Sequence, residues 1–497
     1  MTVRRPDDGD GRSDLKAAPA VVGGGLLRIE RRSIDFVPES ERHGRVTDQG
    51  PFWFLCNCQF FVIAIGFVGP SLGLSLGYTA LAAVLGIGIG TVFQAFHASQ
   101  GPGLGLPQMI QSRAQFGFRG VIVPLIADLV ALMGYNVIAT VLIAVGLHAL
   151  WGVDRAASAI AVSLLAGALA IWGHDWLHRT FKILFWISLP LFIALSGAIV
   201  LGRAGGTAHA AGAFAWPAFL TQLASAASYN ITAAPYVSDY SRYLPRRTRR
   251  DVIVAQVFGG SAISAIWMII LGAWLASRAG FSDGLIALKT SGDAVVGGLG
   301  SLLAATTTAA VIATIALTAY SAMLASFTIA DGFTPTRPSR RLKALVVTVM
   351  TAAWTAASIV FSDNAVTSLN ALLVIILYVL APWTAVNLID YFFLRRGRYA
   401  ILDLFTPHGI YGAWGVRGLF AYALGFAASL PFFVVPNVYT GPIAARLGGV
   451  DIGWLVSLAA SAGAYLLVSR RFDPATEADA VARSEAAIAA AEGGSLG

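Results

Sequence analysis

The chain has 497 residues, a mean hydropathy of +0.71 and only 12% charged residues. Soluble domains carry roughly 25% charged residues, so this composition excludes a water-soluble globular protein. The formal net charge of +8 does not indicate a nucleic-acid partner, because the Lys and Arg residues lie in the gaps between apolar stretches.

Twelve apolar stretches between Pro51 and Ser469 are long enough to cross a bilayer, whose hydrocarbon core of about 30 Å needs about 20 helical residues. They predict an all-α polytopic membrane protein with twelve transmembrane helices. The predicted spans are residues 52–76, 78–98, 121–148, 156–173, 181–201, 213–238, 252–276, 296–328, 343–361, 366–392, 418–436 and 451–469.

Positive charge is divided unevenly between the two sides of these spans. With the N-terminus inside, 29 of the 34 Lys and Arg residues fall in internal loops and in the two tails. Positive residues collect on the cytoplasmic side of membrane proteins. The pattern therefore predicts a multi-pass protein of the cytoplasmic (plasma) membrane, surrounded by lipid, with both termini cytoplasmic.

The two ends of the chain are predicted to be cytoplasmic tails, residues 1–50 and 470–497. Residues 1–26 lack the basic and continuous apolar regions of a signal peptide. The only cysteines, Cys56 and Cys58, lie two residues apart in the first span, where a helix points their side chains in nearly opposite directions. They predict neither a disulfide nor a metal site.

The first and sixth spans contain helix-breaking residues. Gly66, Gly69 and Pro70 end the regular part of the first, and Pro235 follows Asn230 by five residues in the sixth. Paired interruptions five spans apart are expected of a five-plus-five inverted repeat, and in secondary transporters they mark the substrate site. Gly and Pro are also common in ordinary membrane helices, which is the alternative.

Four motifs stand out along the chain: RRSIDFVPESERHG (31–44), the first-span pattern of Asn57, Gly66, Gly69 and Pro70, the loop GLPQMIQSRAQFGFRG (105–120) and DYSRYLP (239–245). Together they resemble the nucleobase:cation symporter family one, most closely its purine-cytosine permease branch. The resemblance covers about residues 31–470. It implies a LeuT-like fold, alternating access, and import of a nucleobase such as cytosine or a purine together with a cation.

The implied fold has ten core helices in two inverted repeats plus two peripheral helices. The first repeat (helices 1–5) would occupy residues 51–201 and the second (helices 6–10) residues 213–392. The peripheral helices 11 and 12 would occupy residues 417–469.

In that family the substrate lies between helices one, three, six and eight, held by aromatic rings and amides. Tyr can stack against a planar base, and Asn can match its edge with both a donor and an acceptor. For each amide, a structural hydrogen bond between helices is the alternative. The resemblance implies the substrate-binding residues Asn57, Gln59, Gly66, Gly134, Tyr135, Asn136, Tyr229, Asn230, Thr314 and Thr318.

The chain departs from the family pattern in two places. Thr314 and Thr318 stand in helix eight where an Asn-rich segment is often found, and Tyr229 and Asn230 stand where a tryptophan is frequent. A Thr cannot imitate the paired donor and acceptor of an amide. The substrate is therefore left open between a nucleobase and another small solute such as allantoin, a hydantoin, a vitamin or an amino acid.

The coupling ion is predicted to be a proton, with sodium as the alternative, and no cofactor is expected. No Glu occurs between residues 42 and 476, so Asp128 in the third span is the candidate proton carrier. A structural cap or pair is its alternative role. Sodium would need carbonyls of the broken first helix together with hydroxyls such as those of Thr307 and Thr308.

Two other classes of protein fit the sequence poorly. The segment from His174 to His178 resembles a zinc HExxH motif with Asp for Glu, but no third ligand is evident and no G-x-S-x-G elbow occurs. A channel would need a repeated filter or a ring of charge. We therefore expect a transporter and not an enzyme, with no nucleic-acid partner; the oligomeric state is left open.

Overall fold

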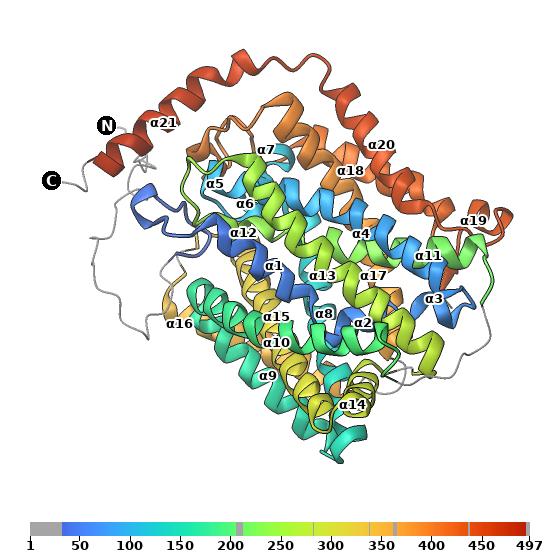
Figure 1. Cartoon of the computed structure of the whole chain (residues 1–497). Helices are drawn as coiled ribbons and strands as arrows, with labels where there is room; N and C mark the ends of the chain where they lie inside the picture. Colours follow the sequence, from blue (N-terminus) through green and yellow to red (C-terminus); the bar gives the residue numbers. More distant parts are fainter. Residues whose placement is uncertain are drawn as a thin grey trace, which may run out of the picture.

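The structure, a computed structural model, is built almost entirely of helices (Figure 1). Of the predicted N-terminal tail, residues 1–31 lie outside the described residues. The described residues are 32–204, 212–281, 283–336, 338–360, 365–435 and 438–493.

Eight helices of the described chain are long and apolar enough to cross a membrane, and one bent helix pair raises the number to nine. The eight match the second to fifth and the seventh to tenth predicted spans. They are α4 (Leu76–Ala98), α8 (Ile122–Trp151), α9 (Arg155–Trp172), α10 (His174–Val200), α13 (Arg250–Ala279), α15 (Leu299–Asp331), α16 (Arg340–Val360) and α17 (Ala365–Ile389).

The last two predicted spans correspond to the shorter apolar helices α18 (Val416–Ser429) and α20 (Gly453–Val468). Apart from the helices of the first and sixth predicted spans, the other α-helices are short or lie outside the apolar stretches. They are α3 (Val68–Ser71), α5 (Gln100–Leu104), α6 (Gln108–Gln111), α7 (Arg113–Phe116), α14 (Gly284–Val295), α19 (Pro442–Arg446) and α21 (Ala478–Gly493).

The other regular elements are smaller still. Strands β1 (Val434–Val435) and β2 (Tyr439–Thr440) form one antiparallel pair, in which Val434 faces Thr440. A π-helical turn, Asp390–Leu394, continues α17. Short 3-10 helices span Glu39–Glu41, Val46–Asp48, Ile401–Phe405, Leu430–Phe432 and Pro474–Glu477.

The first predicted span is broken earlier than the sequence indicates. Helix α1 (Gln49–Asn57) ends before Cys58 and α2 (Phe60–Ile65) begins after Gln59, whose backbone is fully extended. The two halves meet at an angle of 55°. At the predicted break, Gly66 and Phe67 form a turn between α2 and α3 (Val68–Ser71), and Gly69 and Pro70 lie within α3.

The reason for the glycine at position 66 is close packing. A Cβ added to Gly66 would lie 2.2 Å from the carbonyl oxygen of Ile269, and one added to Gly272 would lie 2.1 Å from that of Ile63. No real Cβ approaches a carbonyl so closely, so these two glycines let α2 lie directly against α13.

The interruption predicted in the sixth span is confirmed. Helix α11 (Trp216–Ile231) ends one residue before Thr232, and α12 (Val237–Ser241) begins two residues after Pro235. The missing N–H of Pro235 and the following turn account for the gap between the two helices.

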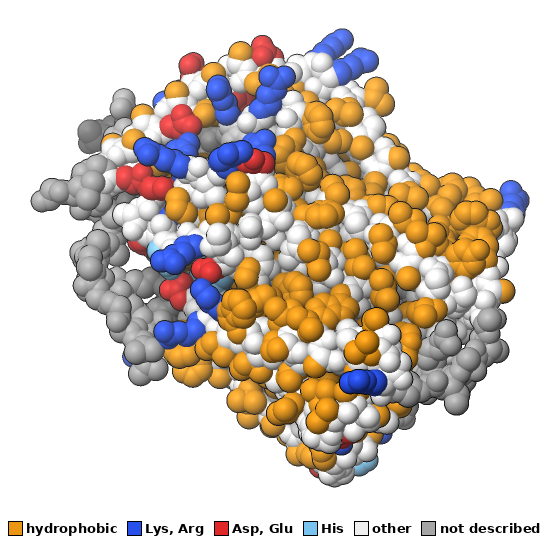
Figure 2. All heavy atoms as spheres, in the orientation of Figure 1, with side chains coloured by type: hydrophobic (Ala, Val, Ile, Leu, Met, Phe, Trp, Pro, Cys, Tyr) orange, Lys and Arg blue, Asp and Glu red, His pale blue; other side chains and the backbone are white. Residues whose placement is uncertain are grey.

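The helices differ in how deeply they lie in the bundle. In the apolar segments of α15 and α17, 67% and 72% of the residues are buried, the largest fractions among the eight helices; in α10 the fraction is only 22%. Figure 2 shows a broad apolar surface on this face of the molecule, with most Lys, Arg, Asp and Glu side chains gathered at the end near α21. We call this the charged end.

A buried carboxylate joins four segments at the charged end. Asp390 accepts hydrogen bonds from Gln115 Nε2 and Tyr399 OH, both at 2.7 Å, and from Tyr465 OH at 2.8 Å. It also forms an ion pair with Arg395.

Arg395 extends this network to the segment that leads into α21. Its Nε and Nη2 atoms donate to the two carboxylate oxygens of Glu477, each at 2.8 Å. Burial opposes the charge of Arg395, but Asp390 and Glu477 outweigh it and hold the pKa of the guanidinium well above its usual value.

Replacing this buried carboxylate should destabilise the fold. We expect Asp390→Asn to lower the free energy of unfolding by about 3 kcal/mol, because it removes the charge that compensates buried Arg395. Asp251→Asn is the control, since Asp251 forms an exposed ion pair with Arg249. The thermal unfolding midpoint of this control variant in detergent should hardly differ from that of the wild type. Equal midpoints for the two variants would contradict the importance of the network.

Candidate functional site

A small cavity, which we call the central cavity, lies where both interrupted helices meet α4, α8 and α15. Its volume is about 20 Å³, which is room for about one water molecule. Its lining is made by Trp53, Cys56 and Asn57 from α1, Gln94 from α4, Tyr135 from α8, Tyr229 and Asn230 from α11, Thr232, Ala233 and Tyr236 from the turn before α12, and Thr314 and Leu317 from α15.

Half of the ten residues implied by the family resemblance line this cavity. They are Asn57, Tyr135, Tyr229, Asn230 and Thr314. The other five, Gln59, Gly66, Gly134, Asn136 and Thr318, are not among its lining residues. The structure thus brings helices one, three, six and eight together around a polar space, as expected.

Gln59 bridges the break in the first span. Its Nε2 atom donates to the carbonyl oxygen of Cys56, which has no helical partner, and to Thr314 Oγ1 at 3.3 Å. The hydroxyl of Tyr229 donates to the same Cys56 oxygen at 3.1 Å. These bonds tie the end of α1 to α11 and α15, so Gln59 shapes the wall of the cavity.

The start of α2 is held by α15. The backbone N–H of Phe60, freed by the break, donates to Thr307 Oγ1 at 2.7 Å. Thr307, one of the two candidate sodium ligands, is therefore engaged with the backbone. Within the described chain, the buried hydroxyl of Thr308, the other candidate, has no hydrogen-bond partner.

Asn136 and Thr318 pair with each other behind the cavity. Thr318 Oγ1 lies 2.5 Å from Asn136 Oδ1 and 3.0 Å from the carbonyl oxygens of Thr314 and Ile315. This contact joins α8 to α15. Gly134, two residues earlier, faces the side chain of Leu372 on α17.

Aromatic rings surround the cavity. The ring of Phe61 lies 4.5 Å from that of Tyr135 and 6.1 Å from that of Tyr229. The Tyr135 hydroxyl is buried without a hydrogen-bond partner in the described residues. A planar ligand between these rings could stack on their π faces and reach the Tyr135 hydroxyl.

Asp128 is buried in α8, with 2% of its surface exposed. Its Oδ1 atom has no hydrogen-bond partner among the residues described. The role of proton carrier and the alternative role of a structural cap or pair both stay predictions for Asp128.

Toward the charged end the central cavity is closed by aromatic side chains. Tyr240 donates from its hydroxyl to the carbonyl oxygen of Leu317 at 2.6 Å, and its ring lies within 6.0 Å of those of Phe52, Trp53 and Tyr320. These contacts join α1 and α12 to α15.

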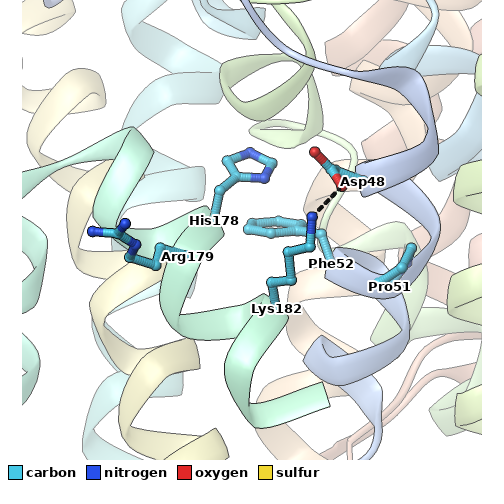
Figure 3. A pocket seen from close by; sticks show the side chains of 6 residues that line it. All are labelled: Asp48, Pro51, Phe52, His178, Arg179 and Lys182. Atoms are coloured by element: carbon cyan, nitrogen blue, oxygen red, sulfur yellow. Dashed lines mark hydrogen bonds and ion pairs between the residues drawn. The ribbon is translucent and has the colours of Figure 1, made fainter. Parts of the chain in front are cut away.

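A second cavity of about 250 Å³ lies nearer the charged end, between α1 and α10 (Figure 3). Lys182 reaches from α10 to Asp48, with 3.1 Å between Nζ and Oδ1, beside the ring of Phe52. That ring stacks on His178 with 4.2 Å between centroids. Phe52 thus contributes both to this cavity and to the aromatic closure of the central one.

Sequence reasoning missed Trp53, Gln94 and Tyr236 as lining residues. The signal for Gln94 was available, because a side-chain amide inside an apolar span is expensive unless it has a role. Tyr236 directly follows Pro235, at the predicted interruption. For Trp53 there was no such signal, because its contact with the cavity depends on where the first span breaks.

Apolar helices packed around a polar cavity at two interrupted spans define a secondary transporter. A family model described as a permease for cytosine/purines, uracil, thiamine and allantoin matches residues 36–457. The chain belongs to this family, and the family predicted from the four sequence motifs is confirmed. It is a multi-pass membrane transporter and not an enzyme.

Named relatives agree with this family. The chain is 32% identical over 448 residues to a protein of Bacillus subtilis (strain 168) that bears the name "Putative purine-cytosine permease YxlA"; the match covers 89% of this chain and 96% of YxlA. It is 24% identical to the purine-cytosine permease FcyB of Emericella nidulans, over 88% of each chain.

Solved structures share the fold. Mhp1, a nucleobase-cation-symport-1 family transporter solved in a closed conformation with bromovinylhydantoin bound, superposes with a TM-score of 0.70 at 17% identity, covering 92% of this chain and 99% of Mhp1. A Na⁺-coupled sialic acid symporter gives 0.61 at 15% identity, covering 88% and 92%.

The packing role of Gly66 can be tested directly. We expect Gly66→Ala to lower the free energy of unfolding by about 2 kcal/mol, since its Cβ would overlap the Ile269 carbonyl. Gly88→Ala on α4 is the control, because nothing lies within 4 Å of its added Cβ. Thermal unfolding in detergent distinguishes them, and an unchanged midpoint for Gly66→Ala would show that α2 and α13 are less tightly packed.

Proposed function

We propose that this protein is a symporter that imports a nucleobase, such as cytosine or a purine, across the cytoplasmic membrane by alternating access. The observation that carries the proposal is the central cavity, where amides and tyrosine rings from both interrupted helices face one space. Such a site can stack on a planar base and pair with its edge. The names of the relatives support the same substrate class.

A second candidate is import of a related heterocycle. The family description includes uracil, thiamine and allantoin, and Mhp1 was solved with a hydantoin. Thr314 lines the cavity, and Thr318 lies behind it, where the family often has amides. This departure is the observation that favours the second candidate.

We also propose the twelve-span arrangement with two repeats of five, residues 51–201 and 213–392, and peripheral helices in residues 417–469. The nine candidate spans, the α11–α12 pair, α18 and α20 together make up twelve. The charged end would be cytoplasmic, because Lys and Arg residues collect on that side. Both tails would then lie in the cytoplasm.

The proposed contacts with the base come from Asn57, Tyr135, Tyr229, Asn230 and Thr314. The other five residues implied by the resemblance, Gln59, Gly66, Gly134, Asn136 and Thr318, would hold the surrounding helices in place. A cavity of about 20 Å³ is too small for a base, so binding requires its walls to move apart. Movement of α1 away from α10 would open the cytoplasmic side by separating Phe52 from His178 and Asp48 from Lys182.

We propose the proton as the coupling ion, with Asp128 as its carrier. The carboxylate is buried and its Oδ1 is free of hydrogen bonds within the described chain. Sodium is the alternative, and the engagement of Thr307 by the Phe60 N–H makes that hydroxyl a poorer ligand.

Uptake measurements test the substrate and the ion together. Cells expressing the protein would be given radiolabelled cytosine, adenine, hypoxanthine, uracil, allantoin and thiamine, with and without a protonophore and with sodium replaced by choline. We expect saturable, protonophore-sensitive and sodium-independent uptake of cytosine or a purine. Uptake of allantoin or thiamine alone would favour the second candidate.

The role of Asp128 has its own test. We expect Asp128→Asn to abolish uphill accumulation of the base, because an amide side chain cannot take up and release a proton as a carboxylate can. Exchange of labelled for unlabelled base across proteoliposome membranes should continue. Asp251→Asn, at an exposed ion pair, should leave both activities unchanged. Protonophore-sensitive accumulation by Asp128→Asn would exclude Asp128 as the proton carrier.

A further inference from the structure

Gln94 is a buried amide without any hydrogen bond in the described part of the chain. It lies on α4, lines the central cavity and has 1% of its surface exposed. Its Oε1 atom is buried without a partner. Burying an amide removes its hydrogen bonds to water, and this costs free energy when no protein group replaces them. Such an amide can recover this free energy by binding a ligand or a water molecule.

One turn earlier on α4, Thr91 determines which way the neighbouring amide of Asn230 points. The hydroxyl of Thr91 donates to the carbonyl oxygen of Ile87 at 2.6 Å, which uses its only proton. Its oxygen can then only accept, and Asn230 Nδ2 donates to it at 2.7 Å. The Oδ1 atom of Asn230 is therefore left as a fixed acceptor at the cavity.

Asn57 is oriented in the same way from the other interrupted helix. Its Nδ2 atom donates to the backbone carbonyl oxygen of Ser261 at 2.9 Å. A carbonyl oxygen can only accept, so the amide cannot be turned around without losing this bond. Its Oδ1 atom is the second fixed acceptor among the lining residues.

Gln94 differs from these two amides because nothing fixes its orientation. It can present its acceptor and its donor in either order to a ligand edge. Alone it would accept either an amino group beside a bare ring nitrogen or a keto group beside a ring N–H. The two fixed acceptors remove this ambiguity, because a keto oxygen buried against them would lack a donor.

We propose that Gln94 is a specificity-determining residue that pairs with the amino edge of the transported heterocycle. Its Oε1 accepts from the exocyclic amino group and its Nε2 donates to the adjacent ring nitrogen. Asn57 and Asn230 accept the remaining N–H donors of the ligand. The site therefore prefers amino-substituted bases to their keto counterparts. This inference rests on the proposed function and names the chemical class of its substrate.

The test compares bases that differ only at this edge. Dissociation constants for cytosine and uracil, and for adenine and hypoxanthine, would be measured on the purified full-length protein. We expect the amino member of each pair to bind at least about tenfold more tightly than the keto member. The ratio is obtained on one preparation, so it does not depend on the fraction of folded protein.

Two variants should reduce this ratio in different ways. Gln94→Met keeps the length of the side chain but removes both polar atoms, and should weaken cytosine binding by roughly tenfold. Thr91→Val removes the hydroxyl that fixes Asn230, so its amide can turn around, and uracil binding should improve. Thr79→Val is the control, because the one hydrogen bond of the Thr79 hydroxyl among the described residues goes to the carbonyl oxygen of Ser75 in the same helix. The binding ratio of this variant should equal that of the wild type.

The outcomes separate this inference from the proposed function. If the wild type binds no base at all, the proposed function fails and the inference fails with it. If bases bind but keto members are preferred, or Gln94→Met and Thr91→Val both keep the wild-type ratio, only the inference is overturned. Gln94 would then be an amide that bonds to a trapped water.

Discussion

Inside a lipid bilayer there is no water to hydrogen-bond a backbone group that loses its helical partner. A membrane helix can therefore be interrupted only where the protein supplies replacement partners. Here α15 supplies one to the start of α2 through Thr307 and Phe60 N–H, while Gln59 and Tyr229 satisfy the Cys56 carbonyl. The groups that repair the break are thus the groups that bring α1, α2, α11 and α15 together. The central cavity lies at this junction because the interruption and its repair occur there.

The limited number of hydrogen-bond donors and acceptors also determines how two of the lining amides are oriented. Each hydroxyl has one proton, so a threonine that donates to its own helix can only accept from a neighbouring amide. Thr91 does so for Asn230, and a backbone carbonyl does so for Asn57. The orientation of two lining amides is decided by ordinary helix geometry. Gln94 has no such neighbour in the described part of the chain, so its amide is not oriented in this way.

The charged end has a different physical problem, because it must hold ions at the edge of an apolar bundle. Buried Asp390 is satisfied by Arg395, two tyrosines and Gln115, and Arg395 is satisfied in turn by Glu477. A buried pair of this kind is costly when one partner is missing. The network thus ties the loop of residues 105–120, the end of α17, α20 and the segment before α21 together at the charged end.

The sequence by itself determined the apolar spans, the family and the interruption at Pro235, because span length, motif and proline chemistry are local properties. Through the family resemblance it also predicted four of the five spans that meet at the cavity, and five of its lining residues. It could not place the first break at Cys58 and Gln59, because no proline or glycine marks it. Tertiary packing alone decided that Gly66 serves α13, that Gln59 bridges to α15, and that Gln94 and Trp53 reach the cavity. Those roles depend on which helix lies opposite, and that contact is not encoded in any single segment.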